Sequence, residues 1–126
     1  GALDMSIKHV KGRKQFGRPL GAFQVTQFKI AEMATKVEIA RNTVYKSTWL
    51  LDQGKPDTKL TAMAKLFACH VAVEVVDEAL QLHGGYGYFN DYDIERFYRA
   101  AKVLEIYEGT KEVEKIVISR EVLGKL

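Results

Sequence analysis

Cysteine is almost absent from this sequence, since Cys69 is the only one among 126 residues. A single cysteine cannot form a disulfide within the chain. Because Cys69 lies in a helical pattern close to Phe67, we interpret it as a small buried apolar residue rather than a reactive thiol. The spacings between Cys69 and the histidines match no zinc-ligand pattern, so no metal site is expected; these are His9, His70 and His83.

Long apolar runs and dense basic segments are also missing. The sequence has no apolar run of roughly 18 residues and no signal peptide, so we expect an intracellular, soluble protein without membrane insertion. Its net charge is only +3, with 16 acidic residues mixed among 19 lysines and arginines. No basic stretch alternates with aromatic residues, so no nucleic-acid partner is expected. A chain of 126 residues, 47% of them hydrophobic, is long enough for one domain with a core.

Proline is scarce, with only 2 residues, and the positions of the glycines and prolines divide the chain into helical segments. The strongest periodic signal predicts a helix of about 45 Å over residues 21–53. Apolar residues recur there every seven positions, with Met33, Ala34 and Ala40 in the intervening turn; they are Phe23, Ile30, Val37, Val44 and Leu51. Gly54 and Pro56 then predict a helix end, and Asp57 or Thr58 can cap the helix that follows.

That next helix is predicted over about 58–83, with apolar residues three or four positions apart. They are Leu60, Met63, Phe67, Val71, Val75 and Ala79. Shorter helices are predicted over about 93–102 and 110–123, the last with Val113, Ile116, Val117 and Leu123 on one face. No segment is typical of a strand. The predicted fold is therefore all-α, an antiparallel up-down four-helix bundle with a short extra helix, in a single domain over residues 1–126.

The first candidate functional motif runs from Arg13 to Gln24, with the sequence RKQFGRPLGAFQ. It is a turn between helices, and its simplest interpretation is a cationic helix end followed by a glycine and proline break. Its functional interpretation is that Arg13 offers a planar guanidinium to a phosphate or carboxylate, with Phe16 as an apolar anchor.

The second motif, QLHGGYG over residues 81–87, is most simply a helix end whose glycines adopt positive φ. Its spacing matches neither the P-loop nor the dinucleotide fingerprint. The glycines nevertheless allow a ligand to approach bare backbone, and His83 is interpreted as a helix-terminus residue rather than a ligand.

The third motif, IYEGT over residues 106–110, places Glu108 on a glycine turn just before the last helix. The helix dipole favours the ionised carboxylate there, whereas burial beside an apolar ligand makes it a stronger base. Thr110, as the expected N-cap, can also lend its hydroxyl and amide to an anionic group.

Taken together, the three motifs resemble the C-terminal domain of the acyl-CoA dehydrogenases, flavoenzymes that introduce a trans double bond between Cα and Cβ of acyl-CoA thioesters. The shared patterns occur in the family's order and cover nearly the whole chain. They are R-x-x-F-G-x-x-L-x-x-x-Q at Arg13–Gln24, Q-L-x-G-G-x-G at Gln81–Gly87 and I-Y-E-G-T at Ile106–Thr110.

The resemblance implies a four-helix bundle that meets a β-domain and a neighbouring subunit around FAD. It implies that Glu108 removes the α-proton while a hydride leaves Cβ for flavin N5, and that Gly109 lies against the thioester. Further residues are implied to contact FAD, several of them across the dimer; these are Arg13, Gln15, Phe16, Gln24, Gln81, Gly84, Gly85, Thr110 and Glu112. The implied setting is fatty acid β-oxidation in a dimeric or tetrameric homo-oligomer, with electron-transfer flavoprotein as the acceptor.

Some positions depart from the family pattern. Glu112 stands where glutamine is frequent, Ala100 replaces an aspartate often found after the arginine matching Arg99, and Phe23 stands where some members carry histidine. In isovaleryl- and long-chain-type branches the base comes from an earlier helix, so Glu108 at the usual position favours short- or medium-chain-like substrates.

The first ten residues have helical apolar spacing without an N-terminal capping signal, so we expect the chain to begin in mid-helix. The expectation is a C-terminal fragment that lacks the family's N-terminal helical domain and β-domain, and that neither retains FAD nor catalyses alone. A non-catalytic helical oligomerisation module and a relative of the acyl-CoA or nitroalkane oxidases are the alternatives. The expected compartment is the cytoplasm of a prokaryote or the mitochondrial matrix of a eukaryote.

Overall fold

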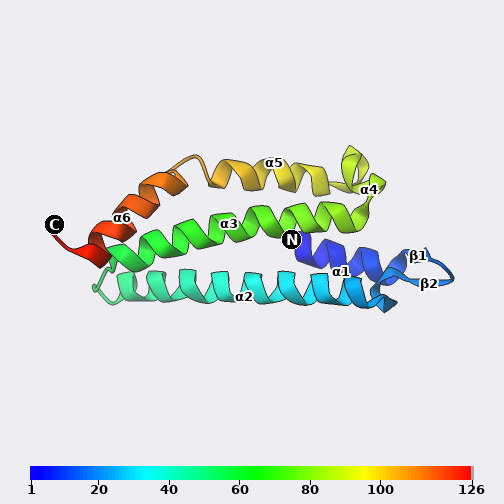
Figure 1. Ribbon diagram of the computed structural model, residues 1–126, viewed down its shortest axis with the longest axis horizontal. Helices are drawn as coiled ribbons and strands as arrows, with labels where there is room; N and C mark the ends of the chain where they lie inside the picture. The colour runs from blue at the N-terminus through cyan, green and yellow to red at the C-terminus, as the bar shows by residue number, and fades with distance from the viewer. Residues whose placement is uncertain (126) are drawn as a thin grey trace.

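The structure is a computed structural model that describes residues 1–125, and nearly all of its elements are helices (Figure 1). In chain order the elements are α1 (Ala2–Gly12), β1 (Lys14–Gln15), β2 (Arg18–Pro19), the 3₁₀ turn η1 (Leu20–Ala22), α2 (Gln24–Asp52), α3 (Thr58–His83), α4 (Gly85–Tyr88), the 3₁₀ turn η2 (Asn90–Tyr92), α5 (Ile94–Leu104) and α6 (Lys111–Leu123). The predicted all-α bundle is confirmed.

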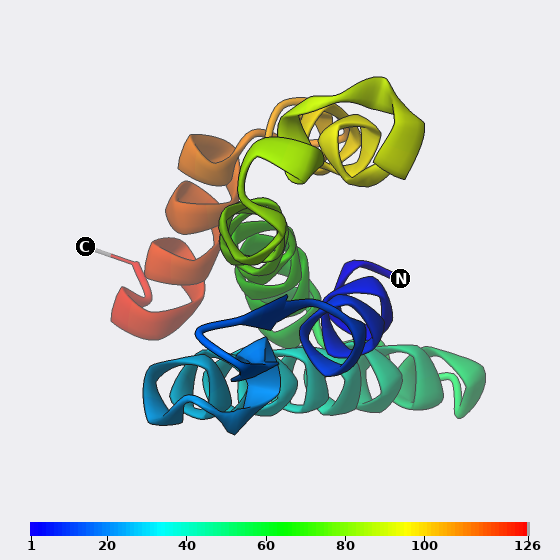
Figure 2. The ribbon, with the colours of Figure 1, turned by 90° about the vertical axis from the view of Figure 1, so that its right-hand side faces the viewer.

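Helix α3 is the centre of the bundle and contacts α1, α2, α5 and α6 (Figures 1 and 2). α2 runs antiparallel to α3 along one side, and the successive helices α5 and α6 follow the other side. The short α1 lies near the end of the bundle that also carries the β1–β2 hairpin and α4. None of the helices within residues 1–125 has the length and apolarity that a membrane span requires.

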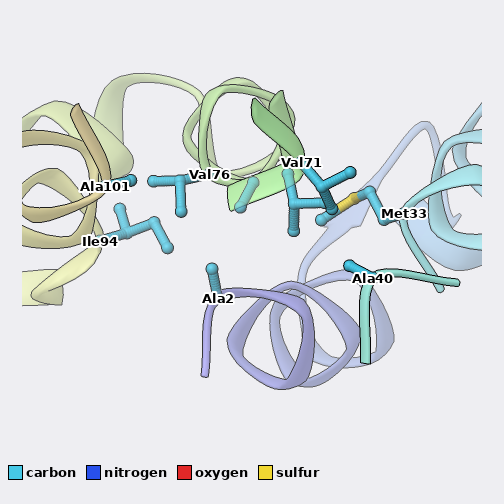
Figure 3. Packing of buried hydrophobic residues seen from close by; sticks show 9 residues of the cluster. Ala2, Met33, Ala40, Val71, Val76, Ile94 and Ala101 are labelled. Atoms are coloured by element: carbon cyan, nitrogen blue, oxygen red, sulfur yellow. The ribbon is translucent and has the colours of Figure 1, made fainter. Parts of the chain in front are cut away.

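The core lies between α1, α2, α3 and α5, and Figure 3 shows its side chains pointing toward one another. Small residues and branched aliphatic residues dominate it; they are Ala2, Met33, Ala40, Val71, Val75, Val76, Ala79, Ile94 and Ala101. Ile94 is the largest side chain that is completely buried. The alanines let the helix backbones pack close together, so most of the buried apolar volume comes from the few larger side chains.

The predicted limits of α3 are confirmed, and its ends show why. The Asp57 carboxylate caps the first turn by accepting a hydrogen bond from the Leu60 N–H at 2.9 Å. At the other end Gly84 has φ +60°, which favours glycine, and its N–H donates to the carbonyl of Gln81 at 3.1 Å. These two residues fix α3 at Thr58 and His83.

Several details of the predicted helices are wrong. α2 begins at Gln24 rather than near Gly21, because η1 precedes it and Phe23 is extended. Its fully buried residues are Thr26, Met33, Ala40 and Ser47, whereas Ala34 and Leu51 are exposed. A small β-hairpin is present although no strand was predicted.

Exposure also differs from prediction outside α2. Cys69 is half-buried rather than buried. In α6, Val113, Ile116 and Leu123 are exposed, while Val117 and Ile118 are half-buried. An open groove between α2, α3 and α6 exposes Met63 and Phe67 of α3; its lining residues include Ile39, Leu66, His70, Glu105 and Ile118. The apolar stripe of α3 is therefore only partly covered within residues 1–125.

Candidate functional site

The first two motifs meet at one end of the bundle, where Arg13 and Tyr86 touch. The Arg13 guanidinium carbon lies 5.0 Å from the centroid of the Tyr86 ring, and its Nη1 lies 3.5 Å from the tyrosine hydroxyl oxygen. A guanidinium over an aromatic ring is a favourable cation–π contact. No carboxylate within residues 1–125 pairs with Arg13, so its charge is available to an anionic ligand.

The turn that follows Arg13 is a two-residue hairpin. Lys14 pairs with Pro19 and Gln15 with Arg18, which leaves Phe16 and Gly17 at the tip with φ of +51° and +78°. Positive φ at both positions is the geometry that matches the twist of hairpin strands. Gln15 is exposed, and 92% of the Phe16 surface is exposed although its ring makes an edge contact with Phe23. An apolar side chain at this exposure is suited to contact another molecule.

The glycine motif ends α3 at the same end of the bundle as that hairpin (Figure 1). Gln81, Gly84 and Gly85 are exposed, and a Cβ added to either glycine would meet no atom within 4 Å. Gln24, the first residue of α2, is exposed at this same end. The structure thus brings together the residues predicted from the first two motifs and leaves bare backbone accessible beside an arginine.

Two stacked histidines lie under this end of the bundle and were not identified as a pair from the sequence. The rings of His9 and His83 are 4.2 Å apart between centroids, and His83 Nδ1 donates to the Ala79 carbonyl at 2.7 Å. His83 is buried as the last residue of α3, which agrees with its interpretation as a helix-terminus residue. Burial lowers the pKa of His9 below its ordinary value of 6.5, because it disfavours the charged ring. The nearby His83 and Arg13 lower this pKa further through charge repulsion.

His9→Gln is expected to weaken the acid sensitivity of folding. Because the folded chain binds this proton less readily than the unfolded chain, the free energy of unfolding falls as pH drops through about 6.5 and below. Urea titrations between about pH 7.5 and 5.5 should show a steeper loss of stability in the wild type than in His9→Gln. Equal pH slopes in the two proteins would show that His9 contributes nothing to this titration.

The third motif forms the connection between α5 and α6. Glu108 is exposed with φ +54°, a left-handed conformation that is uncommon for residues other than glycine, and Gly109 follows with φ +101°. Thr110 is the N-cap of α6, its Oγ1 accepting from the Val113 N–H at 3.4 Å, and Glu112 is exposed in the first turn. The predicted turn, cap and helix start are confirmed.

Gly109 has φ +101°, and the end of one side chain lies close to it. A Cβ at this position would collide with Oε1 of Glu114, whose carboxylate folds back from α6 over the turn. The positive φ of Gly109 favours glycine here, whereas the contacting carboxylate is the end of a flexible side chain that can move. The backbone beside Glu108 is therefore sharply turned, with the Glu114 carboxylate lying over it.

Lys65 of α3 lies beneath this turn, and sequence reasoning missed it. Its ammonium donates to the carbonyls of Leu104 at 2.7 Å, Tyr107 at 3.3 Å and Gly109 at 3.0 Å. A lysine within an alanine-rich helix carries no spacing signal for such a contact, because its three acceptors are backbone atoms about forty residues later in the chain.

A buried carboxylate precedes the turn. Glu105 is 6% exposed, its Oε2 accepts from Lys102 at 2.5 Å, and Oε1 lies 3.7 Å from Nδ1 of His70. The Lys102 hydrogen bond lowers the pKa of Glu105 below its ordinary value of 4.5, although burial raises it. Lys102 belongs to α5 itself, so the His70 contact is the one that joins Glu105 to α3 in this group.

The two candidate regions are well separated along α3. Lys65 and Gln81 are 16 positions apart on one helix, which corresponds to about 24 Å. Figure 1 shows the hairpin and α4 at one end and the α5–α6 connection nearer the other. A single compact active site within residues 1–125 does not contain all three motifs.

The fold and these two exposed regions define an all-α bundle domain with a carboxylate turn in one region and a cation beside bare glycine backbone in the other. The chain belongs to the acyl-CoA dehydrogenase family: the family model described as "Acyl-CoA dehydrogenase, C-terminal domain" matches residues 1–123.

Individual relatives agree with this assignment. The chain is 54% identical over 125 residues to an acryloyl-CoA reductase (NADH) of Anaerotignum propionicum, covering 99% of this chain and 32% of that protein. It is 48% identical over 125 residues to subunit CarC of the caffeyl-CoA reductase-Etf complex of Acetobacterium woodii, covering 99% of this chain and 33% of that subunit.

A solved structure gives the same result in three dimensions. Butyryl-CoA dehydrogenase from Megasphaera elsdenii superposes with a TM-score of 0.95 at 45% identity, covering 97% of this chain and 32% of that one. The chain thus spans about a third of the length of the relatives it matches.

Proposed function

We propose that the protein containing this domain dehydrogenates acyl-CoA thioesters between Cα and Cβ, with Glu108 as the base that removes the α-proton. The observation that carries the proposal is the turn itself, which presents an exposed carboxylate from a left-handed backbone conformation held beneath by Lys65. A general base must stand at contact distance from its proton in a fixed orientation.

The backbone at the turn offers a second contribution to this chemistry. No residue within 1–125 accepts a hydrogen bond from the Glu108 N–H. An unpaired donor beside the base can bind the thioester oxygen as negative charge develops on it during proton removal. Gly109 carries no side chain, so once the flexible Glu114 side chain moves aside the thioester can approach that donor.

The residues of the two regions fit FAD. Arg13 offers an unpaired cation to the pyrophosphate, and the open space over Gly84 and Gly85 allows the adenosine half to lie against backbone. Gln15, Phe16, Gln24 and Gln81 are exposed on the same end of the bundle and would complete this contact. When bound, FAD supplies the acceptor for the hydride that leaves Cβ.

Thr110 and Glu112 would contact flavin on the other side, near Glu108. Thr110 offers its hydroxyl at the start of α6, where the helix dipole favours anionic groups. Glu112 brings a carboxylate to a position where glutamine is frequent in the family. An ionised carboxylate can accept hydrogen bonds from the cofactor but cannot donate one, as an amide would.

The separation of about 24 Å between the regions supports a homo-oligomer, because one bundle would serve two flavins, its own near Glu108 and the partner's near Arg13. Apolar side chains exposed along α2 supply further surface for association; they are Val25, Phe28, Ile39, Tyr45, Trp49 and Leu51. We propose a dimer or tetramer in the parent protein.

A reductase that runs the same chemistry in reverse is the second candidate. Two relatives at 54% and 48% identity are named reductases, and one belongs to a complex with Etf. Electron-transfer flavoprotein is accordingly our proposed redox partner. We place the protein in the cytoplasm if it is prokaryotic and in the mitochondrial matrix if it is eukaryotic.

Residues 1–126 alone are proposed to be inactive and not to retain FAD. Glu108 and the Arg13 region are both exposed, and neither encloses a ligand on every side. Water around an exposed carboxylate keeps it a weak base toward the α-proton of a thioester.

The test is an anaerobic titration of the full-length, flavin-loaded protein with short-, medium- and long-chain acyl-CoA. Bleaching of the flavin absorbance by short- or medium-chain substrates is expected. A protein that binds flavin but is bleached by no acyl-CoA would refute the proposal and favour a non-catalytic module. Hydrogen peroxide formed stoichiometrically in air would indicate an oxidase instead.

A further inference from the structure

The Lys65 ammonium is unusual in its choice of partners. It contacts three carbonyl oxygens and no carboxylate within residues 1–125. An ammonium has three protons to donate, so the three carbonyls use all of them. Lys65 is half-buried on α3, and its charge is directed entirely at the backbone of the α5–α6 connection.

The three carbonyls have distinct positions in that connection. Leu104 is the last residue of α5, where carbonyls lack helical partners and a positive charge is favourable. Tyr107 and Gly109 directly precede and follow Glu108. One side chain therefore holds the helix end, the peptide group that joins Tyr107 to Glu108, and the peptide group that follows Gly109.

The turn needs such support because its conformation is unfavourable. Glu108 has φ +54°, and Gly109 has φ +101°. Left-handed conformations of residues other than glycine persist only where surrounding contacts hold them. The N–H groups of Ile106 and Tyr107 both donate to the Val103 carbonyl. Within residues 1–125 the N–H groups of Glu108 and Gly109 donate to no backbone carbonyl, so backbone hydrogen bonds do not hold the turn at Glu108.

We propose that Lys65 is a positioning residue for Glu108: it does not touch the reacting atoms, but fixes the direction of the carboxylate by holding the carbonyls on both sides. This inference rests on the proposed role of Glu108 as a base. A general base misplaced by about 1 Å can lose about a hundredfold in rate.

The first experiment examines the turn without reference to catalysis. Backbone ¹⁵N relaxation is measured on the 126-residue chain as wild type, Lys65→Met and Lys59→Met. Lys59 is the matched control, because it lies on α3 and its side chain makes no hydrogen bond or ion pair within residues 1–125. In Lys65→Met, order parameters at Glu108 and Gly109 should fall from about 0.85 to below about 0.6. Lys59→Met should match the wild type.

The second experiment uses the full-length, flavin-loaded protein. Lys65→Met is expected to lower kcat about a hundredfold while changing KM less than about threefold and leaving flavin content unchanged. A purely structural role would instead lower flavin content and thermal stability. If Lys65→Met does not fold, Lys65→Gln, which can donate to only some of the carbonyls, should show the same changes in smaller degree.

The outcomes separate the two proposals. Unchanged order parameters in Lys65→Met overturn the positioning role whatever the enzyme does. Lowered order parameters with unchanged kcat, in a protein that Glu108→Gln inactivates, also overturn it and leave the proposed function intact. If Glu108→Gln remains active, the proposed function fails, and so does the positioning of a base by Lys65, even where the order parameters still fall.

Discussion

Glu108→Gln in the full-length, flavin-loaded protein is expected to lower kcat by about a thousandfold to ten-thousandfold. Glutamine has nearly the same shape but cannot accept the α-proton, so the loss measures general-base catalysis. The side chain is exposed and makes no hydrogen bond within residues 1–125, so folding of the bundle should be unaffected. The measurements are α-proton exchange of acyl-CoA into deuterated water and the rate of flavin bleaching.

The matched control is Glu121→Gln, which changes an exposed glutamate near the far end of α6, the helix that follows the Glu108 turn. It should match the wild type in flavin content, α-proton exchange and kcat. Full α-proton exchange in Glu108→Gln, with flavin bound, would show that another residue is the base. Loss of flavin in Glu108→Gln alone would show that the carboxylate serves binding rather than proton transfer.

The helix limits could be predicted where short-range capping determines them. Asp57 and Gly84 delimit α3, and Thr110 begins α6, because a cap depends on residues three or four positions away. Which face of α2 is buried was harder to predict, because the polar residues Thr26 and Ser47 occupy buried positions and apolar periodicity does not count them. Ser47 is accommodated by a hydrogen bond of 2.9 Å to Thr61 across the α2–α3 contact.

The exposure of apolar residues could not be read from the sequence. Periodicity shows which residues share a helix face, but not whether another element covers it. Leu51 and Ile116 continue apolar patterns and are nevertheless 62% and 49% exposed. No element within residues 1–125 covers these two side chains.

The motif residues of the candidate site were accessible from the sequence, but their supports were not. Glu108 and Thr110 are close in sequence, so their turn follows from local rules. Lys65 reaches them from a helix about forty residues earlier, and the Tyr86 ring meets Arg13 across 73 positions. Contacts between residues so far apart in the sequence depend on how the helices pack, which cannot be read from the patterns of a single sequence.

Ile94→Ala is expected to cost about 3 kcal/mol of stability, the largest loss among single truncations of this core. Ile94 is 0% exposed, belongs to the cluster that includes Val76 and Ala79, and lies at the start of α5 beside Gly87. The rest of this core cluster is made of small side chains, chiefly alanines and valines, which cannot move far enough to fill the cavity.

The matched control for this truncation is Ile116→Ala, which removes the same atoms from a side chain that is 49% exposed on α6. Thermal unfolding should show a midpoint roughly 10 °C lower for Ile94→Ala and within about 2 °C of the wild type for Ile116→Ala. Equal effects would contradict the assignment of Ile94 to the core. Because α5 leads directly into the Glu108 turn, the backbone order parameter of Glu108 should fall further on warming in Ile94→Ala than in the wild type. Such a result would link the stability of this core to the placement of the base.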